Sequence, residues 1–196
     1  MGTSTVDLVA ALKQRLAMAT QKDVIHGMFI ENSITLVSQL RSPQFADEVR
    51  TKVIGGKKLV GFFRYPVVDL LKVMEIAVEG AEDPQKILEE FGANSVRIFF
   101  DSPVGRTMLL LASSDPHKLL FSAPAGFKAS ASFGERVYKK EAENAGTMVT
   151  TGDLLGPSWT VGVFRYALGV ACNVKANVEV SHLEGPGLNY VARVSW

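Results

Sequence analysis

Apolar residues along this chain follow helical spacing as far as residue 121 and then alternate with polar residues in several shorter segments. The clearest helix is predicted at 66–79, where apolar side chains recur at i, i+3, i+4 and i+7 and charged side chains take the opposite face. The same spacing predicts an amphipathic helix in the first twenty residues and short helices at 31–40 and 42–54. The first half of the chain is therefore predicted to be mainly helical.

Three polar residues followed by proline mark further helix starts. They are Asp83–Pro84, Ser102–Pro103 and Asp115–Pro116, and each combines a capping side chain with a residue suited to the first helical position. Two apolar segments lie outside this pattern. Residues 24–30 fit either a strand or the start of a buried helix, and residues 58–63 have strand character.

After Pro124 the apolar period becomes two, which is the period of a strand with one buried face. A helix is predicted at 158–172, because its apolar positions return to helical spacing. The predicted strands on either side of this helix are 126–133, 135–141, 146–154, 174–182 and 188–196. The turn at 184–187 makes the last two strands a hairpin.

This order predicts the α+β class, with a helical N-terminal and central part packed on a small antiparallel sheet that ends in a helix and a C-terminal hairpin. A chain of 196 residues fits one domain, 1–196, in which residues 1–20 are a possible helical extension.

Composition excludes several classes. Net charge +1 gives no strong overall field toward nucleic acid or a membrane, so we expect no nucleic-acid partner. The longest uncharged apolar runs, LVGFF and MLLLA, are far shorter than a transmembrane segment. One cysteine, Cys172, cannot form an internal disulfide, which favours a reducing compartment. The chain is expected to be soluble and cytoplasmic.

Short motifs give a resemblance to a known family. They are a Tyr-Pro-x-x-Asp helix start at 65–69, a Leu-x-x-Phe-Gly segment at 88–92, a Pro-x-Gly-Arg helix start at 103–106 and a terminal Tyr-x-x-Arg-Val-Ser-Trp at 190–196. The chain resembles a family of paralogues of about 200 residues, abundant in myxobacteria and classed as a domain of unknown function. More distantly, the order of elements is similar to four-vinyl-reductase-type, Bet3-like and haem-nitric-oxide-binding domains. That likeness implies a cavity for a small apolar molecule or a regulated interaction surface.

No catalytic or metal-binding signature is found. His26, His117 and His182 are scattered and lack a partner ligand at helical spacing. The Tyr-x-Ser-x-Arg signature of haem-nitric-oxide-binding domains is absent, as is the Gly-x-Ser-x-Gly nucleophile elbow. The Gly-Gly-Lys-Lys run at 55–58 lacks the spacing of a phosphate loop and indicates an exposed turn. We therefore expect no cofactor, no metal and no enzymatic activity.

The helix at 158–172 carries small and aromatic residues opposite its apolar stripe, which makes it a candidate pocket wall. Glycines let a ligand or another backbone come close, so tight helix packing is the alternative interpretation. Arg165 could bind an acidic group, but pairing with a glutamate is the safer expectation. Cys172, at the margin of the stripe, is expected to be a packing residue. The candidate wall residues are Phe62, Phe63, Tyr65, Gly162, Arg165, Tyr166, Gly169 and Cys172.

The leading hypothesis is a non-enzymatic cytoplasmic module that binds a small apolar or amphipathic ligand, or a protein partner, in signalling or regulation. The alternative is a structural protein that forms a homodimer without any ligand, through the first helix or an exposed sheet edge.

Overall fold

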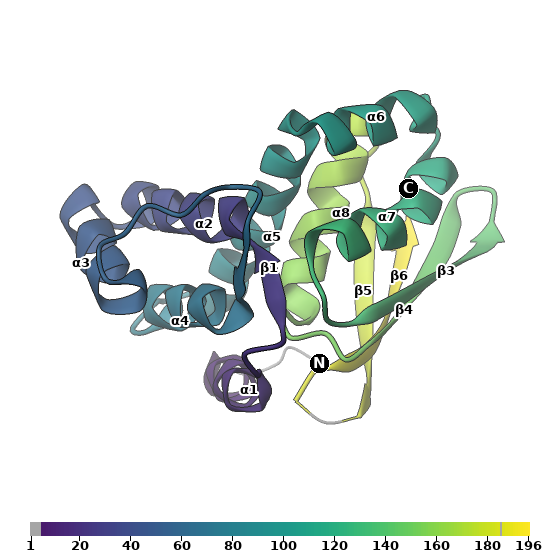
Figure 1. Ribbon diagram of the computed structural model, residues 1–196. Coiled ribbons are helices and arrows are strands. Elements are labelled where there is room, and N and C mark those ends of the chain that lie inside the picture. The colour runs from purple at the N-terminus through teal and green to yellow at the C-terminus, as the bar shows by residue number, and fades with distance from the viewer. Residues whose placement is uncertain (1–4, 185) are drawn as a thin grey trace.

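A computed structural model of the protein describes residues 5–184 and 186–196. Its elements follow the predicted order of helices, a small sheet, one helix and a closing hairpin, as Figure 1 shows. The helices are α1 (Thr5–Met18), α2 (Gly27–Leu40), α3 (Pro43–Ile54), α4 (Val67–Val78), α5 (Pro84–Asp101), α6 (Pro103–Ala112), α7 (Pro116–Ser130) and α8 (Pro157–Cys172). The strands are β1 (Val24–His26), β2 (Arg64–Pro66), β3 (Glu135–Ala142), β4 (Ala145–Thr151), β5 (Asn177–Glu184) and β6 (Asn189–Ser195). The α+β class is confirmed.

The cap signals in the sequence place the helix starts. Asp83, Ser102 and Asp115 each accept a hydrogen bond from a backbone N–H of the helix that follows, with proline at the next position. Ser42 does the same for α3 by accepting from Phe45. These short-range contacts satisfy N–H groups that have no partner inside the helix, and they are readable from sequence because they are local.

The main sheet has four antiparallel strands in the order β3-β4-β6-β5. The register sets Met148 opposite Ala192 and Val178 opposite Val194, and these four side chains are buried on one face of the sheet. Helix α8 lies along the sheet, with α7 beside it (Figure 1). A second, two-stranded ladder pairs β1 with β2 and sets Ile25 opposite Tyr65.

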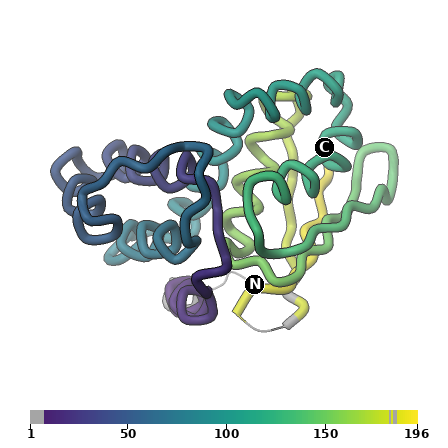
Figure 2. Tube along the Cα trace, in the orientation of Figure 1, coloured from purple at the N-terminus to yellow at the C-terminus, as the bar shows by residue number. Residues whose placement is uncertain are grey.

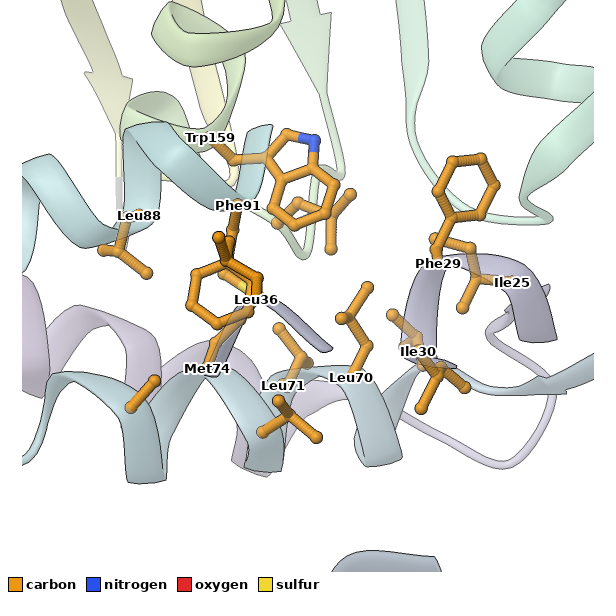
Figure 3. Packing of buried hydrophobic residues seen from close by; sticks show 14 of the residues in the cluster. Ile25, Phe29, Ile30, Leu36, Leu70, Leu71, Met74, Leu88, Phe91 and Trp159 are labelled. Carbon is orange, nitrogen blue, oxygen red and sulfur yellow. The ribbon is translucent and has the colours of Figure 1, made fainter. Parts of the chain in front are cut away.

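Two hydrophobic clusters form the interior. The first joins α1, α2, α3, α4 and the start of α5, and Figure 3 shows Phe91 of α5 beside Met74 of α4, with Trp159 above them. The second lies between the sheet, α7 and α8, with Met148 and Leu168 at its centre. Leu12 of α1 is fully buried in the first cluster, so the first helix packs into the core. We call α1–α4 the helical half and the four-stranded sheet with α7 and α8 the half that contains the sheet. The tube in Figure 2 shows these two halves side by side, joined through α5 and β1.

The predicted strand at 126–133 is wrong. Helix α7 runs through Pro124 to Ser130, and only Ala131 makes an isolated bridge, to Ile25. The alternation of Phe127 and Phe133 with Lys128 is typical of a strand. In the structure, however, the buried residues of this helix contact the core at helical spacing. They are Leu119, Leu120, Gly126 and Ser130. Tertiary packing of these positions outweighs the cost of a proline inside the helix.

Smaller differences concern short segments. Residues 24–30 divide into β1 and the start of α2, so both interpretations of that segment hold in part. Residues 58–63 form a loop before β2, and the hairpin strand begins at Asn177 and not at Val174. Part of the predicted turn at 184–187, namely Gly185, lies outside the described residues. Within the described chain, no helix combines the length and apolarity that a bilayer crossing requires.

Candidate functional site

An apolar cavity of about 120 Å³ lies where the two hydrophobic clusters meet. It is bounded by β1, α2, α5, α6, α7 and α8, so elements from both halves of the protein contribute to its wall. The lining residues are Ile25, Phe29, Ser95, Val96, Phe99, Phe100, Met108, Leu119, Leu120, Ala123, Gly126, Phe127, Ser130, Leu155, Trp159, Val163, Phe164 and Ala167.

The size of the cavity limits what it can hold. An apolar protein cavity of about 150 Å³ takes up benzene or xenon. Pockets for drug-sized ligands occupy about 300–1,000 Å³. A cavity of about 120 Å³ therefore suits a diatomic gas, a noble-gas atom or a molecule close to a small ring in size.

The two hydroxyl groups in the wall are already bonded within their own helices. Ser95 Oγ donates to the carbonyl of Gly92 at 2.6 Å, and Ser130 Oγ donates to the carbonyl of Gly126 at 3.0 Å. A hydroxyl that bonds its own helix offers no hydrogen to a ligand. The lining residues thus favour an apolar molecule that needs no hydrogen-bond partner.

Glycine at position 126 brings two helices together over the cavity. A Cβ atom there would lie 3.0 Å from the sulfur of Met108 on α6 and 3.2 Å from the ring of Phe99 on α5. Such distances are tighter than ordinary contacts, so any larger residue would displace Met108 or Phe99. Gly126 therefore fixes how closely α7 approaches α5 and α6.

Helices α5 and α8 meet at their backbones. A Cβ on Gly92 of α5 would come within 2.0 Å of the carbonyl oxygen of Trp159, and a Cβ on Gly162 of α8 would come within 1.8 Å of that of Glu89. These two glycines allow a helix contact that no other residue permits. Gly162, a candidate pocket residue, contacts the neighbouring helix and lies outside the cavity lining.

The polar candidates on α8 face α5. Arg165 Nη1 pairs with Glu89 Oε2 at 2.5 Å, which is the glutamate pairing expected from the sequence. Tyr166 accepts a hydrogen bond from Arg97 Nε at 3.2 Å, and the Arg97 guanidinium lies 5.3 Å from the centre of its ring. Both side chains therefore have protein partners.

Gly169 and Cys172 occupy the end of α8. Gly169 shares an open groove with Arg165 and Lys175, and a Cβ there would meet only the carbonyl of Val174, at 4.0 Å. The thiol of Cys172 is partly buried, and burial is the main reason why its pKa is raised, with the charge of Asp115 second. A raised pKa leaves less of the nucleophilic thiolate at neutral pH.

The aromatic candidates belong to a separate region. Phe62 and Phe63 lie in the loop before β2 and are 73% and 55% exposed. Tyr65 is partly buried, and its hydroxyl accepts a hydrogen bond from the backbone of Val60 at 3.1 Å. The structure thus brings Gly162, Arg165 and Tyr166 together on α8 and sets the three aromatic residues elsewhere, and none of the eight candidates lines the cavity.

The residues that do line the cavity are not among the eight candidates. Val163, Phe164 and Ala167 belong to the apolar stripe of the helix at 158–172, which predicts core positions. The stripe was the available signal, but periodicity cannot distinguish a packed side chain from one that borders free volume. Phe99, Leu119 and Trp159 become neighbours only through tertiary contacts.

A buried polar cluster lies beside the cavity, and we define it as Arg15, Arg136, Asp153, Thr160 and Tyr190. Asp153 is fully buried, and its Oδ1 pairs with Arg136 Nη2 at 3.0 Å. Tyr190 donates to Asp153 Oδ2, and Thr160 Oγ1 lies 2.6 Å from the Tyr190 oxygen. Because the single Tyr190 hydrogen goes to Asp153, Thr160 is the donor in that second contact.

The same cluster holds the start of α8 and the first helix. The backbone N–H groups of Leu155 and Gly156 donate to Asp153 at 3.1 and 3.3 Å. Arg15 of α1 donates to the carbonyl of Leu154 at 3.1 Å and to that of Pro186 at 2.9 Å. Burial lowers the pKa of Arg15, and the charge of Asp153 partly opposes that shift.

Burial and the negative charge of Asp153 raise the pKa of Tyr190 well above its ordinary value. The tyrosine therefore stays protonated as a donor to the carboxylate. Phe127 links this cluster to the cavity, since the ring lines the cavity and the Arg136 guanidinium carbon lies 3.3 Å from its centre.

Residues 18–196 match the family described as "Protein of unknown function (DUF2378)". The chain belongs to the DUF2378 family. The predicted membership of a family of unknown function is therefore confirmed, while a myxobacterial source stays a prediction. A comparison of this DUF2378 chain with curated proteins gave no significant match.

Solved structures similar to the DUF2378 chain are H-NOX domains. The unliganded Fe(II) H-NOX protein from K. algicida superposes with a TM-score of 0.71 at 16% identity, over 87% of this chain and 96% of that one. An oxygen-binding H-NOX domain related to soluble guanylate cyclases, in its oxygen complex, superposes with a TM-score of 0.67 at 12% identity, over 87% and 94%. The likeness to the haem-nitric-oxide-binding fold is confirmed as a likeness of fold.

The cavity of the DUF2378 chain does not fit a haem. Haem iron in proteins is held by His, Cys, Tyr or Met side chains. Among the lining residues, Met108 alone carries such an atom, and about 120 Å³ is below the volume of pockets for large ligands. His117 lies outside the lining, and its two ring nitrogens contact the Tyr138 hydroxyl at 2.6 Å and the Glu143 carbonyl at 2.8 Å.

Proposed function

We propose that this chain is a non-enzymatic cytoplasmic regulatory domain that binds a small apolar molecule in the cavity. The observation that carries the proposal is the cavity itself, whose wall is apolar apart from the indole N–H of Trp159 and two serines already bonded to their own helices. Apolar molecules gain free energy by leaving water for such a space. A ring-sized or smaller ligand matches a volume of about 120 Å³.

The position of the cavity supports a regulatory role. Ile25 and Phe29 belong to the helical half, whereas Phe164 and Ala167 belong to the half that contains the sheet. A bound molecule would contact both halves and change how they pack, because close-packed interiors respond to added volume by shifting whole elements. Solved neighbours of this fold include an H-NOX domain in its oxygen complex and one that gave insight into H-NOX activation, which is consistent with small-molecule sensing.

Xenon uptake tests the proposal, with Trp159 as the reporter in the cavity wall. In a Trp196→Phe background Trp159 is the only tryptophan, so quenching of its fluorescence by dissolved xenon reports occupancy of the cavity. Methyl NMR shifts of Val163 and Leu120 under the same xenon pressure give a second readout.

Two matched pairs of variants locate the binding site. Ala167→Leu and Ala123→Leu extend side chains into the cavity and are expected to abolish the xenon response. Ala171→Leu and Ala125→Leu add the same atoms to the same helices at positions outside the lining, and the response should persist. Equal responses in all four variants, or no response of the wild type, would overturn the proposal.

A further inference from the structure

A basic loop with an aromatic tip projects from the helical half of the protein, and we define the basic loop as residues 57–64. It is the connection that leads from α3 past α2 to the strand beside β1 in Figure 1. The segment from Arg50 to Arg64 contains five basic residues and no acidic one, although the whole chain has a net charge of only +1. Charge is therefore concentrated here in a way that the overall composition conceals.

Most of this charge is unneutralised. Arg50 pairs with Glu31 at 2.7 Å, but Lys57, Lys58 and Arg64 make no ion pair with the described residues. All three are exposed, as is Lys52. Arg64 Nη2 donates to the carbonyl of Ala129 at 3.2 Å, and the charge of Lys58 helps to lower the pKa of Glu31. The loop therefore presents three exposed cations, none of them in an ion pair, to the solvent.

The tip of the loop is apolar and uncovered. Phe62 is 73% exposed and Phe63 is 55% exposed, with Val60 beside them at 42%. The two rings meet edge to face with their centres 4.9 Å apart. Exposure of two adjacent phenylalanines to water is unfavourable, so the pair is a candidate for contact with another apolar phase.

The exposure of these rings does not come from a loosely held loop. The carbonyls of Gly61 and Phe63 accept hydrogen bonds from the first N–H groups of α2, Met28 at 2.9 Å and Gly27 at 2.8 Å. Glu31 accepts from the backbone of Leu59 at 2.5 Å, and Arg50 donates to the carbonyl of Lys57 at 3.0 Å. The backbone is thus fixed at both ends and holds the rings outward.

We propose that the basic loop docks the protein on an anionic lipid bilayer, with Phe62 and Phe63 entering the headgroup region and Lys57, Lys58 and Arg64 contacting acidic lipids. Basic residues around exposed aromatic side chains are the chemistry of reversible attachment to the negative cytoplasmic leaflet. This surface is distinct from the cavity, so the proposal stands independently of ligand binding.

The size of the apolar tip favours a lipid surface over a protein. The exposed parts of two phenylalanines amount to roughly 200–300 Å². One partner in a stable protein interface contributes about 800 Å². A second copy of this chain is also disfavoured, because its own basic loop would repel this one.

Co-sedimentation with lipid vesicles tests the proposal. Vesicles of phosphatidylcholine with about one third phosphatidylserine should bind the wild type at about 0.05 M salt, and binding should fall steeply at about 0.5 M salt, because salt screens the cations. Vesicles of phosphatidylcholine alone should bind it weakly. Phe62→Trp gives a second readout, since its emission should shift to the blue when the ring enters the headgroup region.

Variants assign the binding to the loop. The doubles Phe62→Ser with Phe63→Ser and Lys57→Gln with Lys58→Gln should each weaken vesicle binding about tenfold or more. The control double, Leu110→Ser with Leu111→Ser, removes two leucines of α6 that are 79% and 72% exposed and should leave binding unchanged. All of these positions are exposed, so circular dichroism should show a folded protein in each case.

Three results would overturn the proposal. The wild type would fail to bind anionic vesicles at low salt, or the Phe62/Phe63 double would bind as well as the wild type. The third result is that the wild type does not bind vesicles but binds soluble polyglutamate through Lys57 and Lys58. That result would assign the loop to an acidic protein partner.

Discussion

The cavity and the buried polar cluster are neighbours with opposite physical character. Phe127 borders the cavity with its ring, and the Arg136 guanidinium lies against that same ring. On α8, Trp159 lines the cavity while the next residue, Thr160, belongs to the polar cluster. One turn of one helix thus contributes to an unfilled apolar space and to a nearly saturated hydrogen-bond network.

The difference shows what each region contributes to the protein. In the polar cluster, directional contacts to Asp153 fix the loop at 153–156 and the start of α8, and Arg15 ties the first helix to that loop through the Leu154 carbonyl. Among the described residues, Arg136 Nη1 is the exception in the cluster, since it is buried without a partner. In the cavity, contacts are non-directional, so no hydrogen bond has to break when the surrounding elements shift around a bound molecule. The polar cluster therefore fixes the positions of these elements, and the cavity provides space for a ligand between them.

The largest predicted effect is at Asp153. Asp153→Asn keeps the shape of the side chain but removes the charge that neutralises Arg136 in a buried setting. Loss of one partner of a buried ion pair costs about 3–5 kcal/mol, and we expect this loss in the free energy of unfolding measured with urea. Asp101→Asn, an exposed aspartate at the end of α5, is the control and should change stability by less than about 0.5 kcal/mol.

That result would also separate the two regions. Xenon quenching of Trp159 in the folded fraction of Asp153→Asn should decrease, because the loop at 153–156 carries Leu155 of the cavity wall. If Asp153→Asn lowers the free energy of unfolding by less than about 1 kcal/mol, the polar cluster does not fix the positions of these elements.

An intermediate effect is predicted at Tyr190. Tyr190→Phe removes the hydrogen bonds to Asp153 and Thr160 and should cost about 1.5–3 kcal/mol at neutral pH. Because the pKa of Tyr190 in the folded state is raised above the unfolded value of 10.0, its contribution is complete below that pH and is lost as pH rises beyond it.

The stability difference between wild type and Tyr190→Phe should therefore be constant below about pH 10 and shrink as the pH rises above it. Urea unfolding of both proteins across that range measures it. Tyr166→Phe, at a partly buried position of α8, is the control for the loss of a tyrosine hydroxyl. A constant difference across the range would contradict the assignment of a protonated, buried Tyr190.

The parts of the fold that depend on local contacts were predictable. Asp83, Ser102 and Asp115 cap their helices through backbone groups two or three residues away, so the sequence alone located those starts. The strand predicted at 126–133 failed, because Pro124 and the alternation around Phe127 pointed to one structure while burial of Leu120 and Gly126 required another. Helix α7 is determined by contacts with α5 and α6 that no local pattern contains.

The candidate site was less accessible to prediction for the same reason. The apolar stripe of α8 was recognised, but the free volume beside Ala167 depends on how Phe99 and Leu119 pack from other helices. The partners of the polar cluster are also far apart in sequence, since Arg15 and Leu154 are separated by 139 positions. In the sequence, Arg15 is one charged residue within the apolar pattern of the first helix. Its burial follows from the carbonyls that tertiary structure brings to it.

The smallest predicted effect concerns Ser95, a polar residue of the cavity wall. Ser95→Ala removes a hydroxyl that donates only to the carbonyl of Gly92, one turn earlier in the same helix. That carbonyl remains in the α5 backbone, and alanine is the better helix former, so stability should change by less than about 0.5 kcal/mol.

The matched change Thr160→Ala should cost about 1–3 kcal/mol, because it leaves a buried Tyr190 oxygen with one partner fewer. Urea unfolding of the two variants in parallel measures the contrast. Equal losses would mean that the cavity wall is as dependent on hydrogen bonds as the polar cluster, and the distinction between the two regions would fail.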